Sequence, residues 1–477
     1  MIPDARREIL VTGKLETDYL IIGAGAAAMA FADELLAHSD ARIVMVDRRD
    51  RPGGHWNDAY PFVRLHQPAA FYGVNSRDLG SLDKDTAGFN KGLCNLASGA
   101  EVLAYFDQVM QQRFLPSGRV QYFPMCDVTA DDQFESLLTG ERRSVVVRKS
   151  VVDSAYWTFD IPSRRPPKYR VDSGVRCVPP NAIAQAAKQD DRFVVVGPGK
   201  TGIDTCLWLL EHGIDPDRID WVMPNDAWFI NRAIFQPGDE FFLTTFQSLV
   251  RQFEAVSAAS DITDLFDRLE ASGQLFRLDP AIRPTIYRCA TITEDELAQL
   301  RRIKNVIRLG YVQAVESSRI VLDGGEIPMA PNTLVIDCSA SGISRKPQVP
   351  IWSGNRINVQ MIRTCQPTFS AALIGFIEAT IADPDEKNAL CQPVPNPVLA
   401  IDWLRMLAVS GKNRHAWTSR PKIEEWLVKS RLNALFAAVA RVRPEETDKI
   451  AVLKRLKEAS AAGMAKLPQL LASAGRP

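Results

Sequence analysis

The stretch from Gly53 to Pro68, GGHWNDAYPFVRLHQP, gathers side chains that could serve a flat ligand. Two adjacent glycines let the backbone lie against a ring system, while neighbouring side chains reach over it. His66 could donate a hydrogen bond or, with an unperturbed pKa of about 6.5, transfer a proton at working pH, and Arg64 could hold the ligand by its charge. If the stretch is instead a loop without a ligand, the same residues have structural roles. His66 would then bond to backbone, Arg64 would pair with a surface carboxylate, and His55 would cap a turn.

The segment before this stretch, residues 18–49, has the order of a dinucleotide-binding unit. It reads as a strand, a glycine turn, a helix of small and apolar residues, and a second strand that ends in Asp47. In such units the first glycine makes the turn and the second lets the backbone approach a pyrophosphate. A third small residue allows close helix packing, and the acid binds ribose hydroxyls. The residues expected at this site are Gly23, Gly25, Ala26, Ala28, Asp47 and Arg48.

The pattern recurs in residues 192–226, where a strand, three glycines and a helix follow one another. The substring GKT is similar to part of a phosphate-binding P-loop, but that motif needs a glycine where Val194 stands, so we reject it. The end of the next strand, with Asp226 and later Arg232, leaves the choice between NADPH and NADH open and favours NADPH. The residues expected at this second dinucleotide site are Gly197, Gly199, Lys200, Thr201 and Gly202.

Composition limits the partners of the chain. Its 477 residues are 46% hydrophobic, and Lys plus Arg equals Asp plus Glu at 57 each, so no net field draws the chain to nucleic acid or an anionic membrane. A small or weakly charged substrate fits better. No segment is apolar enough for a signal peptide or a membrane span, which makes a cytoplasmic location the default expectation. The eight cysteines form no CxxC pair and no cluster with histidine, so we predict buried apolar thiols, no metal site and no redox dithiol.

The GAGAAA turn, the acid after it and the GGHW of residues 53–56 together resemble the FAD half of the flavin-containing monooxygenases. The run YP followed by RLHQP is similar to the same superfamily, including its plant auxin-forming branch and, more distantly, Baeyer–Villiger enzymes. The resemblance implies that the stretch 53–68 wraps the isoalloxazine ring of FAD. The residues it implies are Gly54, His55 and Trp56 as FAD contacts, and His66 and Arg64 as catalytic candidates near the reactive side of the flavin.

Two further segments fit the same family. Residues 99–110 are similar to its helix that leads to the strand over adenine, which would place the backbone of Val128 against the adenine edge. Residues 334–342, LVIDCSASG, are similar to its strand that returns from the nicotinamide domain, so Ser341 and Gly342 would approach the flavin. The implied fold class is α/β, with two Rossmann-like dinucleotide-binding domains for FAD and NAD(P)H, a helical insertion and a helical C-terminal segment.

We assign residues 1–165 and 331–477 to the FAD domain and residues 166–330 to the NAD(P)H domain. A helical insertion is expected at about 238–303 within the second of these, where three amphipathic runs occur. The insertion could shape substrate access, pack as plain structure, or form the contact of a homodimer. The helices expected beyond the glycine units are at 241–255, 262–271, 294–303 and 369–380, with further helices within 398–474.

The activity that the resemblance implies is oxygenation of a small metabolite. NADPH reduces FAD, molecular oxygen forms a flavin hydroperoxide, and one oxygen atom passes to a nitrogen, a sulfur or a carbonyl group. Two departures from the family leave the substrate open. Residues 170–191 lack its FxGxxxHxxx(W/F) fingerprint, and His66 stands where many members carry asparagine. An oxidoreductase or oxidase without a stable hydroperoxide, and a non-catalytic flavoprotein redox sensor, remain as alternatives.

Overall fold

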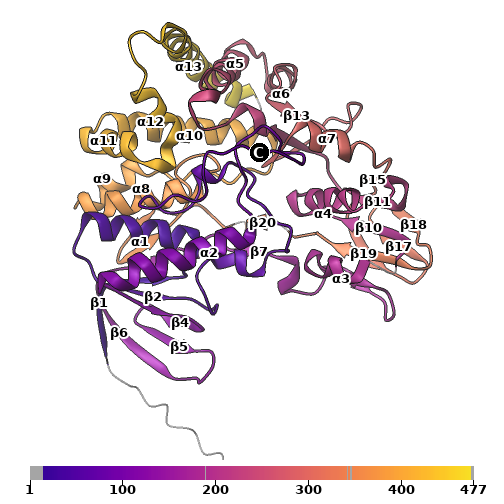
Figure 1. Cartoon of the computed structure of the whole chain (residues 1–477), viewed down its shortest axis with the longest axis horizontal. Helices are drawn as coiled ribbons and strands as arrows, with labels where there is room; N and C mark the ends of the chain where they lie inside the picture. Colours follow the sequence, from indigo (N-terminus) through magenta and orange to yellow (C-terminus); the bar gives the residue numbers. More distant parts are fainter. Residues whose placement is uncertain (1–13, 188–189, 341, 344–345, 474–477) are drawn as a thin grey trace, which may run out of the picture.

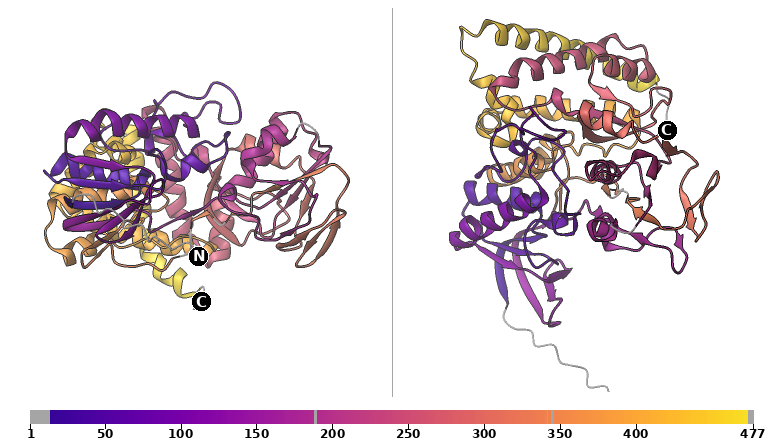
Figure 2. Two further views of the ribbon diagram at one scale, coloured as in Figure 1. Left: turned by 90° about the horizontal axis from the view of Figure 1, so that it is seen from below. Right: turned by 45° about the vertical axis from the view of Figure 1, so that its right-hand side comes forward.

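The computed structural model describes residues 14–187, 190–340, 342–343 and 346–473. Figure 1 shows a first α/β unit at the lower left, a second α/β unit at the right, and a group of helices above both. The same division is visible in the turned views of Figure 2. The α/β fold class expected from the sequence is therefore confirmed, and two separate sheets carry the two glycine turns.

The first unit is built on a sheet with the strand order β21-β22-β6-β1-β2-β3. The strands around β1 are parallel, and β4, β5 and β6 form an antiparallel extension. Alternate residues of β1 and β2 face α1 and α2 on one side and the β4–β5 hairpin on the other, so both faces are buried. The elements are β1 Leu15–Ile22, α1 Ala26–His38, β2 Ile43–Val46, α2 Gly99–Val109, β3 Val120–Phe123, β4 Cys126–Ala130, β5 Gln133–Ser136, β6 Arg142–Asp153, β21 Trp352–Ser353 and β22 Arg356–Asn358.

The second unit has a parallel sheet with the order β15-β11-β10-β19-β9. One face packs against α4 and α7, and a small sheet, β18-β17-β16-β8, covers the other. β19 is the last strand of this sheet along the chain and pairs with β10. After β19 the chain returns to the first unit, where β21 and β22 join the first sheet. The elements are β8 Arg170–Val171, β9 Cys177–Val178, α3 Ile183–Ala186, β10 Arg192–Val196, α4 Lys200–Glu211, β11 Ile219–Val222, α7 Glu294–Leu300, β15 Asn305–Ile307, β16 Val312–Val315, β17 Arg319–Leu322, β18 Gly325–Pro328 and β19 Thr333–Asp337.

The helical layer combines the insertion with the C-terminal helices. Helices α5 and α13, far apart in sequence, pack side by side through one apolar cluster. The insertion helices were expected, but the strands β12, β13 and β14, which form a small sheet of their own, were not. The elements are β12 Ala227–Asn231, α5 Phe242–Ala258, α6 Ile262–Ala271, β13 Leu275–Phe276, β14 Ile286–Ile292, α8 Pro367–Thr380, α9 Pro384–Leu390, α10 Ala400–Thr418, α11 Pro421–Lys429, α12 Ala434–Ala440 and α13 Thr447–Ser473.

Two short strands join the units. β7 (Phe159–Asp160) and β20 (Gly342–Ile343) pair with each other where the chain passes between the two sheets. None of the helices in the described ranges combines the length and the apolar character that a membrane crossing requires. Within the same ranges, no three His, Cys, Asp or Glu side chains gather as a metal ion would need.

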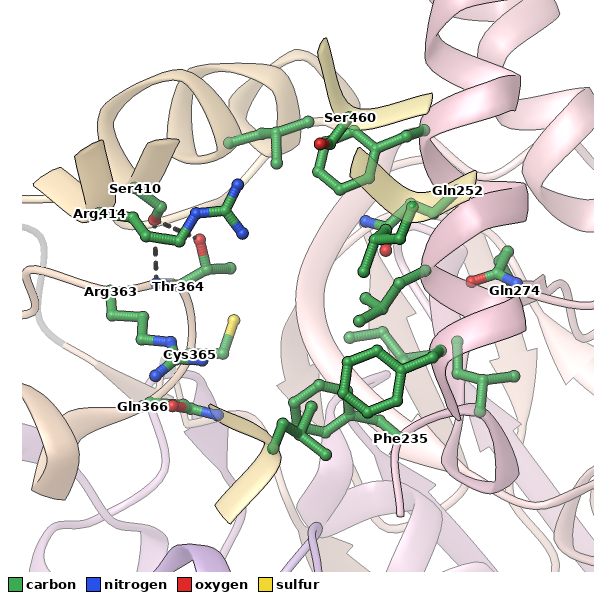
Figure 3. Close-up of a pocket in the computed structure, with 18 of the residues that line it drawn as sticks. Phe235, Gln252, Gln274, Arg363, Thr364, Cys365, Gln366, Ser410, Arg414 and Ser460 are labelled. Atoms are coloured by element: carbon green, nitrogen blue, oxygen red, sulfur yellow. Dashed lines mark hydrogen bonds between the residues drawn. The ribbon is translucent and has the colours of Figure 1, made fainter. Parts of the chain in front are cut away.

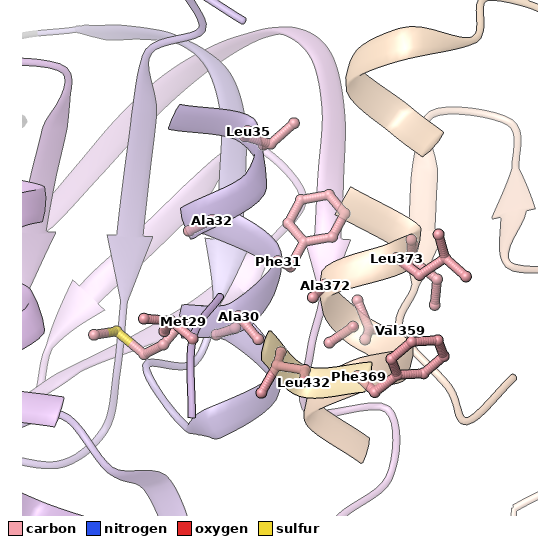
Figure 4. Packing of buried hydrophobic residues seen from close by; sticks show 14 of the residues in the cluster. Met29, Ala30, Phe31, Ala32, Leu35, Val359, Phe369, Ala372, Leu373 and Leu432 are labelled. Atoms are coloured by element: carbon pink, nitrogen blue, oxygen red, sulfur yellow. The ribbon is translucent and has the colours of Figure 1, made fainter. Parts of the chain in front are cut away.

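Helix α8 anchors the helical layer to the first unit by packing along α1 (Figure 4). Phe31 of α1 and Phe369 of α8 are fully buried in this contact. Gly375 lies where the two helices come closest, since a Cβ built on it would be 2.6 Å from the carbonyl oxygen of Phe31 and 3.1 Å from the Cβ of Glu34. The absence of a side chain at Gly375 therefore sets the spacing of the two helices.

Gly375→Ala tests this close approach. The added methyl group would meet backbone, which cannot move aside, so we expect a loss of about 1–3 kcal/mol of stability and a lower thermal unfolding midpoint. Gly411→Ala in α10 is the matched control, because the nearest atoms there belong to the flexible end of Met464. That variant should keep the midpoint or raise it slightly through helix propensity. Equal midpoints for both variants would show that the α1–α8 spacing does not depend on Gly375.

Candidate functional site

The two glycine turns have the same backbone geometry. Gly23 and Gly197 have positive φ values of 99° and 131°, which favour glycine. Gly25 and Gly199 are the N-caps of α1 and α4, with φ, ψ of −79°, −180° and −80°, −179°. Neither helix has a capping side chain or an acidic residue in its first turn, so the first N–H groups are open to an anion. The two turns thus share one backbone geometry, and phosphate binding by them stays a prediction.

Asp47 closes the first turn at the end of β2. Its carboxylate accepts hydrogen bonds from the backbone N–H of Ala24 at 2.6 Å and of Arg49 at 2.7 Å. The other predicted members lie nearby: Ala28 is fully buried in α1, and Ala26 begins that helix. Arg48 instead points outward and forms a two-contact ion pair with Asp127. This pair holds β2 beside β4, the strand that contains Val128.

The second turn is packed more tightly. A Cβ on Gly197 would be 2.5 Å from the carbonyl oxygen of Cys338, and a Cβ on Gly202 would strike the carbonyl of Gly197. Gly199 by contrast has no atom within 4 Å of such a Cβ, so the space beyond this turn is open. Lys200 pairs with Asp204 one turn further along α4, and Thr201 is half-buried beside it.

The loop 53–68 begins in direct contact with the first turn. A Cβ on Gly54 would be 2.9 Å from the Cα of Gly25, and the backbone N–H of Gly53 donates to the carbonyl of Ala24 at 2.9 Å. His55 stacks on Phe159 of β7 with ring centroids 4.1 Å apart. Because β7 pairs with β20, this stack brings the loop next to the strand that contains Gly342. Ser341, the other residue expected there, lies outside the described residues.

The same loop continues to the second turn. The hydroxyl of Tyr60 donates to Asp204 of α4 at 2.7 Å, and Phe62 stacks on Trp208 of the same helix at 5.5 Å. Asn181 of the second unit donates to the carbonyls of Asp58 and Ala59, at 3.0 Å each. One loop therefore contacts the first dinucleotide-binding turn and the helix α4 that follows the second turn. No local pattern predicts the Tyr60–Asp204 contact, since these residues are 144 positions apart.

His66 lies half-buried at the second end of the loop, where its carbonyl accepts a hydrogen bond from Arg232 at 3.1 Å. Burial, with the positive charges of Lys200 and Arg232, lowers the pKa of His66 well below its usual value. This corrects the expectation that His66 titrates at working pH. The imidazole is neutral there, and its role is limited to donating or accepting a hydrogen bond.

Two arginines differ from their expected places. The side chain of Arg64 is 57% exposed and lies 3.7 Å from Asp85, which is the surface pairing considered as the alternative for this residue. Arg232, considered for the choice of NADPH, is 1% exposed and bonds Glu296 at 2.9 Å. The end of the second unit's sheet instead holds Arg308, which pairs with Asp226 at 2.7 Å. Neither Arg64 nor Arg232 faces a dinucleotide turn with a free guanidinium group.

The cysteines require one correction. Cys289 of β14 and Cys365 form a disulfide across 76 residues, whereas the sequence predicted plain buried thiols. The two residues show no CxxC spacing, and only the fold brings them together. Among the free cysteines of the described chain, five are buried and Cys177 is half-buried.

Hydrogen-bond donors at the seam between the two units, the region where the loop 53–68 and the strands β7 and β20 pass from one unit to the other, fit two dinucleotides. Besides the open N–H groups of α1 and α4, the indole N–H of Trp157 and one NH₂ group of Arg165 are buried without a partner among the described residues. Arg165 also lies 3.5 Å from Asp337, at the end of β19 next to the Gly197 turn. Buried donors without partners are costly, and a phosphate or a flavin carbonyl would satisfy them. The residues present therefore suit FAD at the first turn and a nicotinamide dinucleotide at the second.

Comparison with known proteins identifies the class of fold. Residues 21–72, which include the first turn and the loop 53–68, match the family model of the NAD(P)-binding Rossmann-like domain. The polycyclic ketone monooxygenase of the thermophilic fungus Thermothelomyces thermophila is similar over 97% of this chain and 89% of its own, with a TM-score of 0.51 and 12% identity. This likeness concerns the fold, and it confirms the two-unit fold that the resemblance to flavin monooxygenases implied.

Closer relatives occur in mycobacteria. The uncharacterized protein Rv2000 of Mycobacterium tuberculosis is 48% identical over 421 residues, covering 88% of this chain and 78% of the relative. The uncharacterized protein Mb2023 of Mycobacterium bovis matches with the same values. The chain belongs to the family of these mycobacterial proteins.

His55 makes the stability of the protein depend on pH. Burial first, and the charge of Arg49 second, lower the pKa of His55 from 6.5 to about 4. Above pH 6.5, the ordinary pKa that His55 has in the unfolded chain, His55 is neutral in both the folded and the unfolded chain. Between the two values only the unfolded chain binds the proton, so stability falls as the pH falls.

His55→Phe removes this titration and keeps an aromatic ring on Phe159. Between about pH 7.5 and about pH 5, the wild type should lose about 2 kcal/mol more stability than this variant, measured by urea unfolding. His415→Asn, at an exposed position, is the control and should follow the wild type. A parallel decline in His55→Phe and the wild type would contradict the assignment.

Proposed function

We propose that the protein is an FAD-dependent, NAD(P)H-consuming monooxygenase that oxygenates a small molecule through a flavin hydroperoxide. The observation that carries the proposal is the loop 53–68, which contacts the Gly25 turn at one end and the Gly199 helix at the other. Hydride transfer requires the two cofactor rings to meet, and a loop that touches the first turn and the helix after the second is where they would meet. One oxygen atom of O₂ enters the substrate, the other leaves as water, and NAD(P)H supplies the two electrons.

The chain supplies binding and orientation. In this proposal the N–H groups at the starts of α1 and α4 bind the pyrophosphates, and Asp47, at the end of β2, binds the ribose of FAD. Neutral His66 can donate a hydrogen bond at the seam without adding a charge there. NADPH is the preferred reductant and NADH the alternative. A cytoplasmic location, a homodimer and the domain limits at 165, 166, 330 and 331 remain predictions from the sequence.

A flavin oxidoreductase or oxidase without a long-lived oxygen adduct is the second candidate. It is favoured by the segment before β10, which forms β9 and α3 and holds no histidine where the monooxygenase fingerprint is expected. A redox sensor that never turns over would share the same cofactor sites.

Anaerobic mixing of the purified protein with NADPH, and separately NADH, tests the proposal. We expect the absorbance of oxidised flavin to bleach, and a transient oxygen adduct to appear when oxygen is admitted. Direct return to oxidised flavin would support the oxidase. No bleaching with either nucleotide would refute both enzyme functions and leave the sensor.

Two valine substitutions separate the cofactor sites. Gly25→Val would push the loop away, since a Cβ there is already 3.4 Å from the Cα of Gly54, and the protein should be purified without flavin. Gly199→Val has open space, so it should fold and retain flavin while reduction by NADPH slows by about tenfold or more, because the side chain covers the phosphate-binding N–H groups. Loss of flavin in Gly199→Val, or normal flavin content in Gly25→Val, would reverse the assignment of the two cofactors.

A further inference from the structure

A cavity of about 570 Å³ lies between the helical layer and the loop 53–68. Its walls come from α5, α10, α12 and α13, together with residues 363–366 before α8. At one end it is lined by Gln67 and Pro68, which directly follow His66, and by Arg232, whose side chain bonds the carbonyl of His66. The volume is typical of sites for small molecules. The cavity therefore reaches the seam where the proposed chemistry takes place.

The charges of the cavity are all of one sign. No Asp or Glu is among the described residues that line it, whereas Arg232, Arg363, Arg414 and Lys457 are. Arg232 is neutralised by Glu296 at 2.9 Å. Arg363 and Arg414 have no ion pair with any carboxylate in the described ranges, and Figure 3 shows both on the same wall of the cavity. The charges of Arg363 and Arg414 are therefore not compensated by any described residue of the cavity wall.

Neutral partners hold Arg363 in place. It donates to the side-chain oxygen of Asn433 at 2.6 Å and lies over the ring of Phe369, 4.5 Å from the centroid. Neither contact cancels its charge. Burial, followed by repulsion from Arg414, lowers the pKa of Arg363 to about 10, so the side chain stays protonated at neutral pH. A half-buried cation without a counter-charge is costly, and a bound anion would reduce that cost.

The remaining lining separates into a polar and an apolar side. Near the arginines, Thr364 and Ser410 share a hydrogen bond of 2.7 Å, and the side-chain oxygen of buried Gln366 has no partner among the described residues. The opposite side consists mainly of apolar residues of the insertion and α13, with Phe235 labelled in Figure 3. The apolar residues on that side include Phe235, Phe246, Leu249, Phe253, Leu456 and Met464.

We propose that this cavity binds a small carboxylic acid with an apolar body, its carboxylate held by Arg363 and Arg414 and its body against α5 and α13. Guanidinium groups suit carboxylates because they offer several donors in one plane. That this acid is the substrate of the oxygenation rests on the proposed function, whereas its binding does not. In this proposal the insertion shapes the access of the substrate to the site, rather than serving only as packing or as a homodimer contact.

Binding of 4-phenylbutyrate and its neutral amide, 4-phenylbutyramide, to the purified flavoprotein without NADPH tests the proposal. Trp403 and Trp417 line the cavity, so tryptophan fluorescence reports occupancy and calorimetry confirms it. We expect the acid to bind about tenfold or more tightly than the amide, and Arg363→Gln or Arg414→Gln to remove this preference. The matched control is Arg443→Gln, which changes an arginine of the same layer that is 68% exposed and should bind as the wild type does.

A second pair of variants guards against misfolding of the arginine variants. Ser460→Asp places a carboxylate in the cavity wall, and Ser460→Asn differs from it only in charge. The aspartate should abolish binding of the acid, and the asparagine should retain it. Equal affinity for acid and amide, or no binding of either, would overturn the proposal. Binding of the acid without flavin reduction by either NADPH or NADH would overturn the proposed function alone, and reduction without selective acid binding would overturn this inference alone.

Discussion

The backbone contact between Gly25 and Gly54 is the constraint on which the candidate site depends. Neither residue has a side chain, and Gly54 has a φ of 58°, so the loop can start directly against the first dinucleotide turn. A side chain at either position would lift the loop away. The loop would then no longer align Tyr60 with Asp204, and the contact between the first unit and α4 would be lost. Two glycines in contact thus fix a path that extends to the second turn.

The helical layer completes the same site from a third side. Its anchor is α8, which packs closely along α1, the helix that begins at the first turn. Residues 363–366 lie immediately before α8, so the packing that places this helix also places Arg363 at the cavity wall. The disulfide between Cys289 and Cys365 ties the insertion to the same segment. The cofactor turns and the cavity are therefore positioned by one connected set of contacts.

The features that could be predicted from the sequence are those that depend on residues close together in the chain. The glycine turns, the acid after β2 and the insertion helices each follow from local pattern, and the structure confirms them. The sequence did not predict what the fold brings together over long separations, such as the Tyr60–Asp204 bond or the cysteine pair. The neutral state of His66 could not be predicted for the same reason, because it follows from burial and from the charges of Lys200 and Arg232, which the fold brings close to it. The small sheet of β12, β13 and β14 was missed because β12 and β14 are far apart in sequence and pair in a register that no turn between them specifies.

The balance of charge in the whole chain conceals an imbalance inside it. Equal numbers of basic and acidic residues argue against attraction of polyanions to the surface. Within the fold, however, several carboxylates accept hydrogen bonds or form ion pairs that stabilise the structure, such as Asp47 with the N–H groups of the turn and Glu296 with Arg232. Arg363 and Arg414 are left without such partners. Arg363 is half-buried and Arg414 lies at the exposed edge of the same wall, so their charges act over the short range of the cavity and its opening. Selection of an acidic substrate can therefore coexist with a net charge of zero, because the discriminating charges are concentrated at the cavity wall.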